Sequence, residues 1–553
     1  DRTMTISNVT ASVGTRNDNG GYRHYPVTFT VNSSKTLNPT KGWSISFNAP
    51  TNFSAARTLA QNNGVVSNVE VVGNKVTITG NNFDAWTNIQ TYESYSRVIQ
   101  ICLSGTSTTI SSLSGMSATA VEKDLIGYVS TTERQTLFSY IKCLPKDSNN
   151  NVSIELIDNP YMDRPAAHGF NGWKTHEGYT ITTNNLNKVQ TLVANTNGAK
   201  EISVNVYVDW AKANYVFLNA DTPTATASSN NGYDVDSPKR TVAQVKTVFL
   251  DRYNNTSAVS SRELNIIVLT GGNVTDIATF NGMGVGYTLT SIYDGVDYTD
   301  DATFTASANL VCGADFQLHH IRFGRDGVYS LNTNSGDFSY RLIGNTYNVR
   351  LGRGIENVTN ATNCGTFAQV QGGRYNNRKN EYRLVVESGR YSVILLGRAN
   401  GSSLYDYNTT GVLVVGSDID RISGYNDGLN VYTRVNSKTG NTQNSTSISG
   451  KPVHTTIIKS GNIGMQNFSV RGSSYAYCGL YVGGLGNADY DGSDRIAIVE
   501  GGNVANINGG LAVQSGSSVK TYTYVKGGSV QNIVGGAGVS QTYGDRIVQV
   551  TGG

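Results

Sequence analysis

The sequence predicts an all-β fold, and three observations support this prediction. Short runs rich in β-branched residues and tyrosine alternate with Asn- and Gly-rich stretches, which is typical of strands joined by turns. Glycine accounts for 61 of 553 residues, and the 32 tyrosines outnumber phenylalanine (15) and tryptophan (4) together. Charged residues make up only 15% of the chain. This composition excludes a helical bundle, an acidic disordered tail and a dedicated nucleic-acid binder.

Net charge and cysteine content set further bounds. The net charge of +3 gives no global electrostatic field that would steer nucleic acid or acidic lipid toward the protein. The sequence contains no run of 18 apolar residues, so it predicts no transmembrane helix. The five cysteines are widely spaced and form no CxxC pair, so we interpret them as mostly buried small apolar residues. A Cys102–Cys143 or a Cys312–Cys364 disulfide stays open as an alternative.

Residues 1–105 are predicted to form a β-sandwich. Alternating apolar residues occur at 25–31 (YPVTFTV), 43–47 (WSISF), 66–72, 75–79 and 96–103, and Asn, Gly and Pro separate these runs. Several short strands at this spacing favour two packed sheets.

The same region resembles family-2 carbohydrate-binding modules. The resemblance lies in residues 42–47 (GWSISF), 62–64 (NNG), 76–79 (VTIT) and 81–86 (NNFDAW). It implies that Trp43 is a core residue and that Trp86 belongs to an aromatic strip that binds polysaccharide, with Tyr92 and Tyr95 as neighbouring aromatic surface. The other two strip positions lack tryptophan, so we expect a structural sandwich and keep glycan binding as the alternative.

Residues 106–150 are predicted to be a linker followed by a short helical segment. Residues 106–119 (TSTTISSLSGMSAT) have linker composition. Leu137, Ile141 and Leu144 follow at helical spacing behind a candidate cap at Thr131 or Thr132.

Residues 151–213 are predicted to form a small separate module. Residues 164–173 (RPAAHGFNGW) precede the alternating run 204–210 (VNVYVDW), whose valines fall on one strand face that must be buried. This pattern is similar to the Listeria–Bacteroides repeat, a small β-grasp-like module of bacterial surface proteins. The resemblance implies a stalk or adhesive spacer without catalytic chemistry. Trp173 and Trp210 are expected in its core, with sugar stacking as the alternative.

Residues 214–553 carry an internal repeat. The segment 499–510 (VEGGNVANINGG) recurs at 525–536 (VKGGSVQNIVGG) and begins again at 550 (VTGG), so the second glycine recurs after 26 and then 25 residues. A period in the twenties indicates a coil built from stacked rungs. Val499, Val504 and Ile507 are predicted to point into the coil, with glycines at its corners.

The start of this region is similar to that of pectate-lyase-like domains, over 215–219 (YVFLN), 231–234 (NGYD) and 237–249 (SPKRTVAQVKTVF). The resemblance implies a right-handed parallel β-helix with an N-terminal capping helix near 241–250. Thr241 is a plausible N-cap, and Val242, Val245, Val248 and Phe249 form the apolar stripe that such a helix needs. About eleven or twelve rungs of ~25 residues fit the length. Because the last copy stops within a rung, we expect the natural chain to continue beyond Gly553 or another subunit to cover this end.

Two acidic loops are candidate sites. Residues 294–301 (DGVDYTDD) could supply catalytic carboxylates, and Asp489, Asp491 and Asp494 offer the oxygen ligands that calcium prefers. Neither loop has a complete calcium-binding spacing, so ordinary β-turns are the main interpretation and no cofactor is expected, with calcium as the alternative. His319 and His320 lie in an apolar run and are interpreted as one core and one surface residue.

A basic stretch lies between Arg341 and Arg398, where nine arginines and lysines face three glutamates. With interleaved tyrosines, this stretch could bind an anionic glycan or a neighbouring subunit, and we name Arg374, Arg378, Lys379 and Arg383 as the candidate contacts. Solvated arginines scattered over several rungs are the main interpretation. No nucleic-acid-binding module accompanies the stretch.

These predictions favour a non-enzymatic extracellular surface protein of bacterial, Gram-positive type: an adhesin or a fibre or stalk subunit. Its expected partners are other copies or segments of the same surface protein and host or cell-wall glycans, without nucleic acid or membrane insertion. The first alternative is a secreted polysaccharide lyase or glycoside hydrolase that acts on the β-helix face. A phage receptor-binding fibre is a third hypothesis.

Overall fold

A computed structural model provides the fold. It describes residues 2–6, 9–19, 22–33, 40–51, 53–58, 68–80, 95–105, 110, 112–122, 126–129, 136–140, 144–159, 167–175, 178–184, 189–199, 202–255, 261–305, 308–323, 341–357, 367–373, 381–397, 410–423, 428–436, 453–464, 469–470, 473–474, 479–482, 494–509, 520–535 and 545–552. Two compact units divide the chain. The first holds residues 1–158, 171–183 and 189–210, and the second holds 159–170, 184–188 and 211–553.

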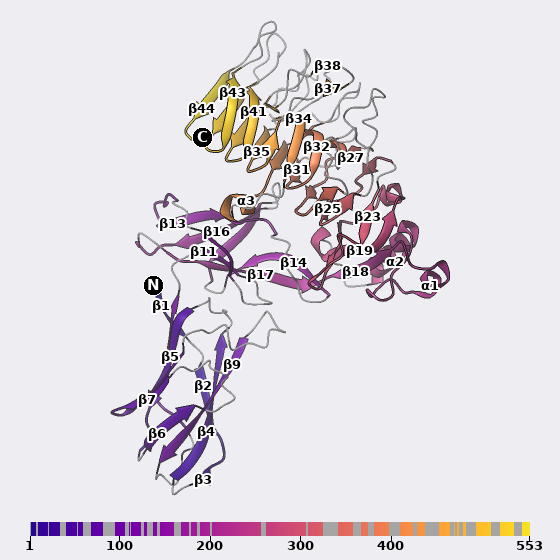
Figure 1. Cartoon of the computed structure of the whole chain (residues 1–553). Coiled ribbons are helices and arrows are strands. Elements are labelled where there is room, and N and C mark those ends of the chain that lie inside the picture. Colours follow the sequence, from indigo (N-terminus) through magenta and orange to yellow (C-terminus); the bar gives the residue numbers. More distant parts are fainter. Residues whose placement is uncertain are drawn as a thin grey trace. The chain divides into compact units, whose positions relative to one another are not determined.

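The first unit begins with an antiparallel β-sandwich (Figure 1). One sheet has the order β1-β10-β5-β8-β7, with β1 (Arg2–Ile6), β5 (Thr40–Asn48), β7 (Asn68–Val72), β8 (Lys75–Gly80) and β10 (Ser117–Glu122). The other has the order β2-β4-β9-β6, with β3 paired to β4; its strands are β2 (Val9–Val13), β3 (Asn17–Asn19), β4 (Tyr22–Ser33), β6 (Phe53–Thr58) and β9 (Tyr95–Gly105).

Alternation along the strands builds the sandwich core, as the sequence predicts. Val27 and Phe29 of β4 face Ile45 and Phe47 of β5, and all four side chains are buried. The rings of Phe29 and Phe47 lie with their centroids 5.4 Å apart. This contact joins the inward faces of the two sheets, which is how a sandwich buries its apolar residues.

The segment 106–150, predicted to be a linker with a helix, contains strands. Residues 117–122 form β10, which lies between β1 and β5, so the sandwich extends past residue 105. Residues 126–129 form β11 (Ile126–Val129), and the predicted helical stretch contains β12 (Thr136–Tyr140). The helix prediction is therefore wrong. β12 pairs antiparallel with β11, and this cross-strand pairing outweighs the weak helical spacing of Leu137 and Ile141.

A small module follows, formed by two sheets. One has the order β12-β11-β17-β14 and the other β13-β16-β15, with β13 (Asn151–Glu155), β14 (His168–Lys174), β15 (Thr180–Asn184), β16 (Val189–Asn195) and β17 (Asn205–Lys212). Val206 and Val208 are fully buried. Trp173 and Trp210 are buried too, and the indole Nε1 of Trp173 donates to the carbonyl of Ile157 at 2.7 Å. The core role predicted for both tryptophans is confirmed, and their burial disfavours sugar stacking.

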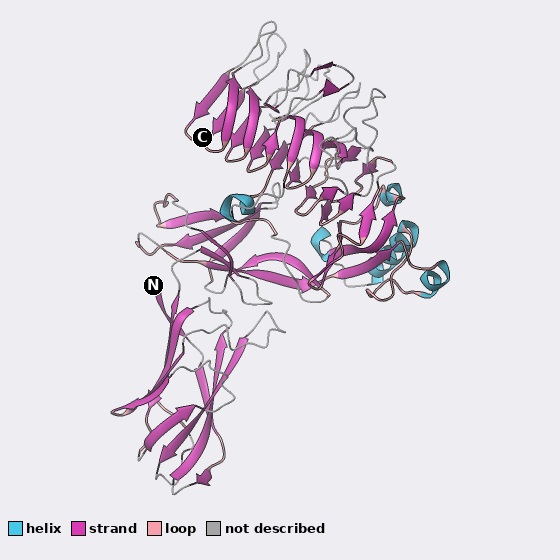
Figure 2. Ribbon diagram, viewed as in Figure 1, coloured by secondary structure: helices cyan, strands magenta, loops and turns pink. Residues whose placement is uncertain are grey.

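The second unit is a coil of parallel strands (Figures 1 and 2). Its long sheet stacks β18 (Asn214–Asn219), β19 (Asn265–Val274), β20 (Tyr287–Thr290), β25 (Phe316–His319), β28 (Val349–Leu351), β31 (Glu381–Val386), β33 (Thr410–Val415), β35 (Val453–Ile458), β40 (Asp494–Val499), β42 (Thr521–Val525) and β44 (Arg546–Val550). Beyond β19, a branch continues through β23 (Ala302–Phe304), β26 (Arg322–Phe323) and β29 (Glu356–Asn357).

A second parallel sheet of the coil has the order β24-β27-β30-β32-β34-β36-β41-β39, with β43 paired to β41. Its strands are β24 (Leu310–Val311), β27 (Arg341–Ile343), β30 (Phe367–Gln371), β32 (Arg390–Leu395), β34 (Asn430–Asn436), β36 (Asn462–Ile463), β39 (Gly479–Tyr481), β41 (Asn503–Asn508) and β43 (Ser529–Val534). The two-stranded sheets β21 (Ile292–Tyr293) with β22 (Val296–Asp297) and β37 (Ser469–Val470) with β38 (Ser473–Ser474) complete the unit. Parallel strands joined by crossovers form a β-helix, and crossovers between parallel strands are almost always right-handed.

The register of the long sheet aligns one aliphatic residue from each rung. This aliphatic column consists of Val216, Ile267, Leu289, Leu318, Leu351, Val386, Val415, Ile458, Val499, Val525 and Val550. Its members are buried in the interior of the coil except the last, Val550, which is 59% exposed. Each strand therefore supports its neighbours through both backbone hydrogen bonds and core contacts. The inward orientation predicted for Val499, Val504 and Ile507 is confirmed, because all three are fully buried.

The helix α2 (Val242–Asn255) occupies the place predicted for the capping helix. Val242, Val245 and Phe249 are fully buried and belong to the core of the coil. At the start of the helix, the Gln244 amide donates to Thr241 Oγ1 at 3.2 Å, and the Thr241 amide donates to Gln244 Oε1 at 3.2 Å. This reciprocal pair is a capping box, which satisfies backbone donors that a helix start leaves open.

The remaining described helices are short: α1 (Thr224–Ser229), α3 (Asp418–Ser423) and the 3-10 turns η3 (Arg262–Leu264) and η4 (Ile277–Phe280). Among the described residues, no helix has the length and apolar character needed to cross a membrane.

Candidate functional site

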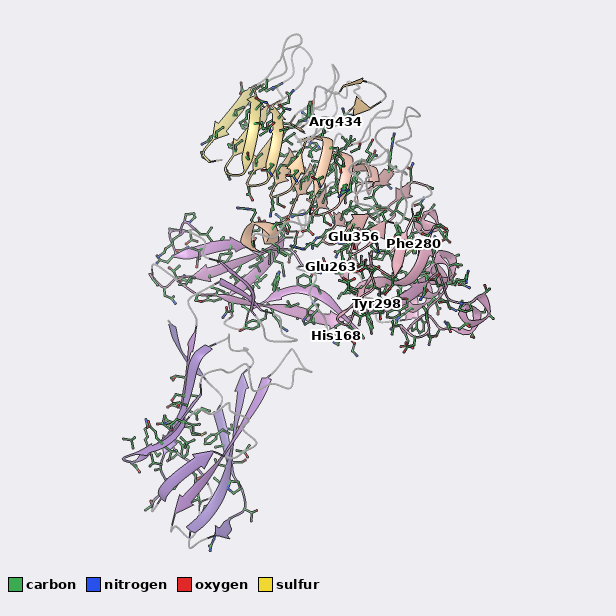
Figure 3. The ribbon with its side chains drawn as sticks, viewed as in Figure 1. His168, Glu263, Phe280, Tyr298, Glu356 and Arg434 are labelled. Carbon is green, nitrogen blue, oxygen red and sulfur yellow. The ribbon has the colours of Figure 1, made fainter. Side chains whose placement is uncertain are left out.

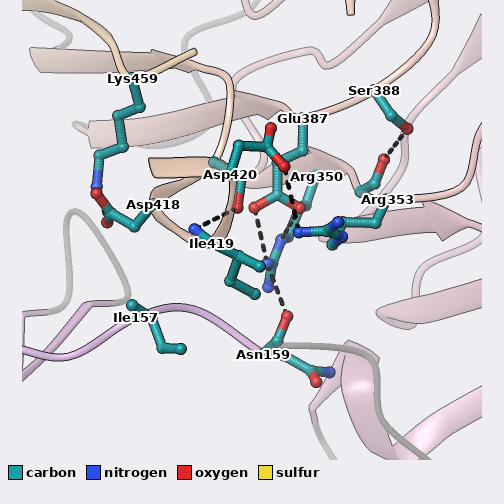
Figure 4. A network of polar contacts seen from close by, with 12 residues as sticks. Ile157, Asn159, Arg350, Arg353, Glu387, Ser388, Asp418, Ile419, Asp420 and Lys459 are labelled. Atoms are coloured by element: carbon teal, nitrogen blue, oxygen red, sulfur yellow. Dashed lines mark hydrogen bonds and ion pairs between the residues drawn. The ribbon is translucent and has the colours of Figure 1, made fainter. Parts of the chain in front are cut away.

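A buried ion pair lies on the outer face of the long sheet (Figure 4). Arg350 of β28 donates to both oxygens of Glu387, at 3.2 Å from Nε and 3.0 Å from Nη2, and also donates to the carbonyl of Asn159 at 3.1 Å. The two side chains are only 3% and 4% exposed. A bidentate pair that is also hydrogen-bonded to the backbone holds this part of the chain in one geometry.

Further charged residues extend this pair into a network along the coil. Asp420 Oδ1 forms an ion pair with Arg353 Nη1 at 3.4 Å, and Asp420 Oδ2 accepts a hydrogen bond from the hydroxyl of Ser460 at 2.9 Å. Asp418 pairs with Lys459, at the end of the next strand of the sheet. The carboxylates of this network thus have cationic or hydroxyl partners.

The network ends at Arg421, which bridges two carboxylates. Its Nη1 lies 3.2 Å from Asp418 Oδ1 and 2.8 Å from Glu500 Oε2. We call these nine residues the turn network, because all of them except Arg350, which lies within β28, follow the ends of stacked strands: Arg350, Arg353, Glu387, Asp418, Asp420, Arg421, Lys459, Ser460 and Glu500. Carboxylates neutralised in this way are poorly suited to proton transfer, and a structural role follows.

The sequence motifs do not single out the turn network, because its members are up to 150 residues apart in the chain. Parallel stacking brings them together, since the ends of successive strands meet at one turn. Aligning the repeats would have given a signal: Glu387, Lys459, Glu500 and Lys526 each come directly after a residue of the aliphatic column.

The acidic loop 294–301 lies beside a second polar group on the β23–β26–β29 branch. Arg322 of β26 pairs in register with Glu356 of β29, and its Nη1 contacts Asp300 Oδ1 at 3.0 Å. The Asp300 carboxylate is 88% exposed. The pKa of the Glu356 carboxyl is raised, and desolvation is the largest cause. The negative charges of Asp300 and Asp297 raise this pKa further, whereas the positive charge of Arg322 lowers it. A carboxyl group that holds its proton more tightly than usual is the chemical requirement for a general acid.

Tyr298 of this loop, labelled in Figure 3, lies near several acidic groups. Burial raises the pKa of its hydroxyl, and Asp236, Asp301 and Asp294 raise it further. Asp297 accepts the Thr299 amide at 2.9 Å, which is an Asx turn. The loop thus combines ordinary turn chemistry with a local excess of negative charge.

The predicted calcium residues fall mostly outside the described ranges. Asp489 and Asp491 are among them, while Asp494 begins β40, where its Oδ1 accepts the Lys520 amide at 3.0 Å. In the part of the chain that the structure describes, no group of three or more His, Cys, Asp or Glu residues is placed to hold a metal ion.

The predicted glycan and anion contacts have a similar outcome. Trp86, Tyr92, Arg374, Arg378 and Lys379 lie outside the described residues, and of Tyr95 only its place at the start of β9 is described. Arg383 lies on β31 with 5% of its surface exposed, and its backbone amide donates to Asn348 Oδ1 at 3.0 Å. The anion contact named for Arg383 stays a prediction, and the burial of this residue disfavours it.

The histidine pair and Cys312 are likewise built into the coil. His319 is buried on the outer face of β25, where its Nδ1 lies 3.2 Å from Thr290 Oγ1 and 3.0 Å from His320 Nδ1. One histidine is therefore buried and the other is more exposed, as expected, although Leu318 and not His319 points into the coil. Cys312 is a buried free thiol, which excludes the Cys312–Cys364 disulfide, and burial raises its pKa.

The fold defines an all-β protein whose largest part is a parallel β-helix with a helical cap. No protein-family model and no curated protein matches the chain. A solved structure, the catalytic domain of a GH87 alpha-1,3-glucanase in complex with tetrasaccharides, aligns with 8% identity and a TM-score of 0.14, over 100% of this chain and 98% of that chain. A TM-score at this level carries no argument about function.

Proposed function

We propose that this chain is a non-enzymatic extracellular surface protein, an adhesin or a fibre or stalk subunit that makes structural contacts and contacts to glycans. The observation that carries the proposal is the turn network. Its carboxylates Glu387, Asp418, Asp420 and Glu500 are tied to arginine, lysine or serine partners along the outer face of the coil. Ion pairs and hydrogen bonds that link successive rungs make the coil resist deformation, which is a property that an extended spacer needs.

The alternative function is a polysaccharide lyase or glycoside hydrolase, and one observation favours it. Glu356 has a raised pKa and lies near Asp300 and Asp297 on the β23–β26–β29 branch. A carboxyl group with a raised pKa near a second carboxylate is the usual arrangement for glycoside hydrolysis.

Turnover measurements separate the two functions. The full chain is incubated with pectins, other uronic-acid polymers and neutral glucans, and unsaturated products and new reducing ends are followed. We expect no turnover, and the variant Glu356→Gln should behave like the original chain. Robust turnover that is lost in Glu356→Gln or Asp300→Asn would overturn the structural proposal and establish the enzymatic one.

A further inference from the structure

The outer face of the long sheet changes character in its last rungs. In a strand, alternate side chains point to opposite faces, so the residues that alternate with the aliphatic column point away from the core. From β35 to β44 these outward residues stack in four files, which the strand register defines. We call this surface the outer face of the last rungs.

The two central files are mostly apolar, with a polar residue at one end of each. One contains Thr455, Ile496, Tyr522 and Ile547, and the other contains Ile457, Ile498, Tyr524 and Gln549. The isoleucines and tyrosines of β35, β40 and β42 are partly exposed, and Ile547 is 43% exposed. The rings of Tyr522 and Tyr524 lie nearly parallel, with their centroids 6.4 Å apart. An exposed apolar surface of this kind on a sheet marks an interaction site.

From β40 onward most residues of the two outer files are charged, and their sign alternates from rung to rung. At the strand starts the file reads Asp494, Lys520 and Asp545, and Lys520 Nζ lies 3.1 Å from Asp545 Oδ2. At the strand ends Glu500 is followed by Lys526 one rung later. An apolar centre between charged rims is the anatomy of a protein–protein interface.

We infer that the outer face of the last rungs binds the same face of a second copy of this chain. The copies are related by a two-fold axis that runs along the strand direction, midway between β40 and β42. This inferred contact rests on the proposed structural function, and it adds to that function the identity of the partner and the surface that binds it.

Charge complementarity selects this arrangement. The axis places β40 opposite β42 of the second copy, so that Asp494 faces Lys520 and Glu500 faces Lys526, and each pair occurs twice. Ile496 and Ile498 then pack against the two tyrosines. A two-fold axis along the coil would instead set Asp494 against Glu500 and Lys520 against Lys526, which opposes like charges. Facing like charges across an interface is strongly unfavourable.

The size of the face predicts a reversible association. Four strands about 4.8 Å apart, each with seven residues at about 3.3 Å, cover roughly 400 Å² in each copy. Stable interfaces bury about 800 Å² per partner. We therefore expect monomers at low concentration and dimers at high concentration.

Sedimentation velocity of the full chain over a wide concentration range tests the inference. The weight-average mass should rise toward twice that of the monomer. Asp494→Lys and Lys520→Asp should each weaken the association constant roughly tenfold or more, because each sets like charges against one another. The double variant Asp494→Lys with Lys520→Asp should restore association. Asp221→Lys, at an exposed turn far along the chain, is the matched control and should change nothing.

Circular dichroism and thermal unfolding show whether each variant is folded. If Asp494→Lys fails to fold, Lys526→Glu tests the other rim, since it should set Glu500 against a new carboxylate. A chain that stays monomeric at the highest concentration overturns the inference. An association constant that is unchanged in the charge variants of both outer files also overturns it. Retention of a strictly monomeric chain on a polysaccharide, lost in Tyr524→Ala, would assign the face to glycan instead. None of these outcomes depends on turnover, so the failure of this inference is distinct from failure of the proposed function.

Discussion

At the residue scale, the Arg350–Glu387 pair is the strongest test of the turn network. Both side chains are almost fully buried, so Glu387→Gln leaves the Arg350 guanidinium without its counter-charge in a site that water does not reach. Removing one partner of such a pair costs about 3–5 kcal/mol. We expect the free energy of unfolding of the second unit to fall by this amount in denaturant titrations.

The exposed pair Arg322–Asp300 is the control for this prediction. Asp300 lies at 88% exposure, so Asp300→Asn should change the free energy of unfolding by no more than about 1 kcal/mol. If the Glu387 and Asp300 variants lose equal stability, the network does not stiffen the coil, and the main argument for a structural role is lost.

The carboxyl group of Glu356 predicts that the stability of the fold depends on pH. Desolvation and the nearby Asp300 raise the pKa of its carboxyl in the folded state. Ionising Glu356 therefore costs the folded state more than the unfolded state, and stability falls as the pH rises through the raised value. We expect Glu356→Gln to raise the thermal midpoint slightly at neutral pH. The gain should vanish below pH ~4, where the unfolded carboxyl is also protonated.

A carboxyl-resolved NMR titration checks the same group directly. The Glu356 signal should titrate at higher pH than glutamate in a model peptide, and Asp300→Asn should shift its pKa downward because one like charge is removed. A midpoint at the peptide value would contradict the raised pKa and remove the one observation that favours the enzymatic alternative.

At the element scale, local patterns predicted most of what the structure contains. Alternation marked the sandwich strands, and the apolar stripe from Val242 to Phe249 marked α2. The helix expected near 132–144 was wrong because pairing of β12 with β11 decides that segment. Propensity and spacing carry no information about such a partner strand.

The rung period also shows where the sequence stops being informative. The step from Val499 to Val525 matches the period of the repeats. By contrast, the step from Val386 to Val415 spans 29 residues, and the step from Val415 to Ile458 spans 43. Insertions between strands hide the period without disturbing the stacked positions. The turn network was hidden for the same reason, since its members become neighbours only once these insertions are removed.

The capping box of α2 gives a prediction at this scale. Gln244→Ala removes the acceptor of the Thr241 amide, and such caps contribute about 1 kcal/mol. Gln244→Glu keeps the acceptor and should be nearly neutral. Phe249→Ala, which empties a fully buried site in the same helix, should cost about 3–5 kcal/mol. Denaturant titrations that rank these variants differently would show that α2 does not close the core of the coil.

At the scale of the whole molecule, the coil should tolerate the loss of a complete rung. Each rung contacts only its neighbours, so stability is close to a sum of rung and interface contributions. Deleting residues 500–525 joins Val499 to Lys526 and removes one register step of 26 residues. The aliphatic column then stays continuous, and each glycine corner meets an equivalent corner.

We expect this deletion variant to fold into a shorter coil, with a strand signal in circular dichroism and a cooperative thermal transition at a slightly lower midpoint. Deleting residues 500–512 is the matched control. It removes half a rung, leaves the following strands out of register with the aliphatic column, and should abolish the cooperative transition. If the whole-rung deletion unfolds the second unit as the half-rung deletion does, then its stability is not additive by rung, and the coil acts as one indivisible fold.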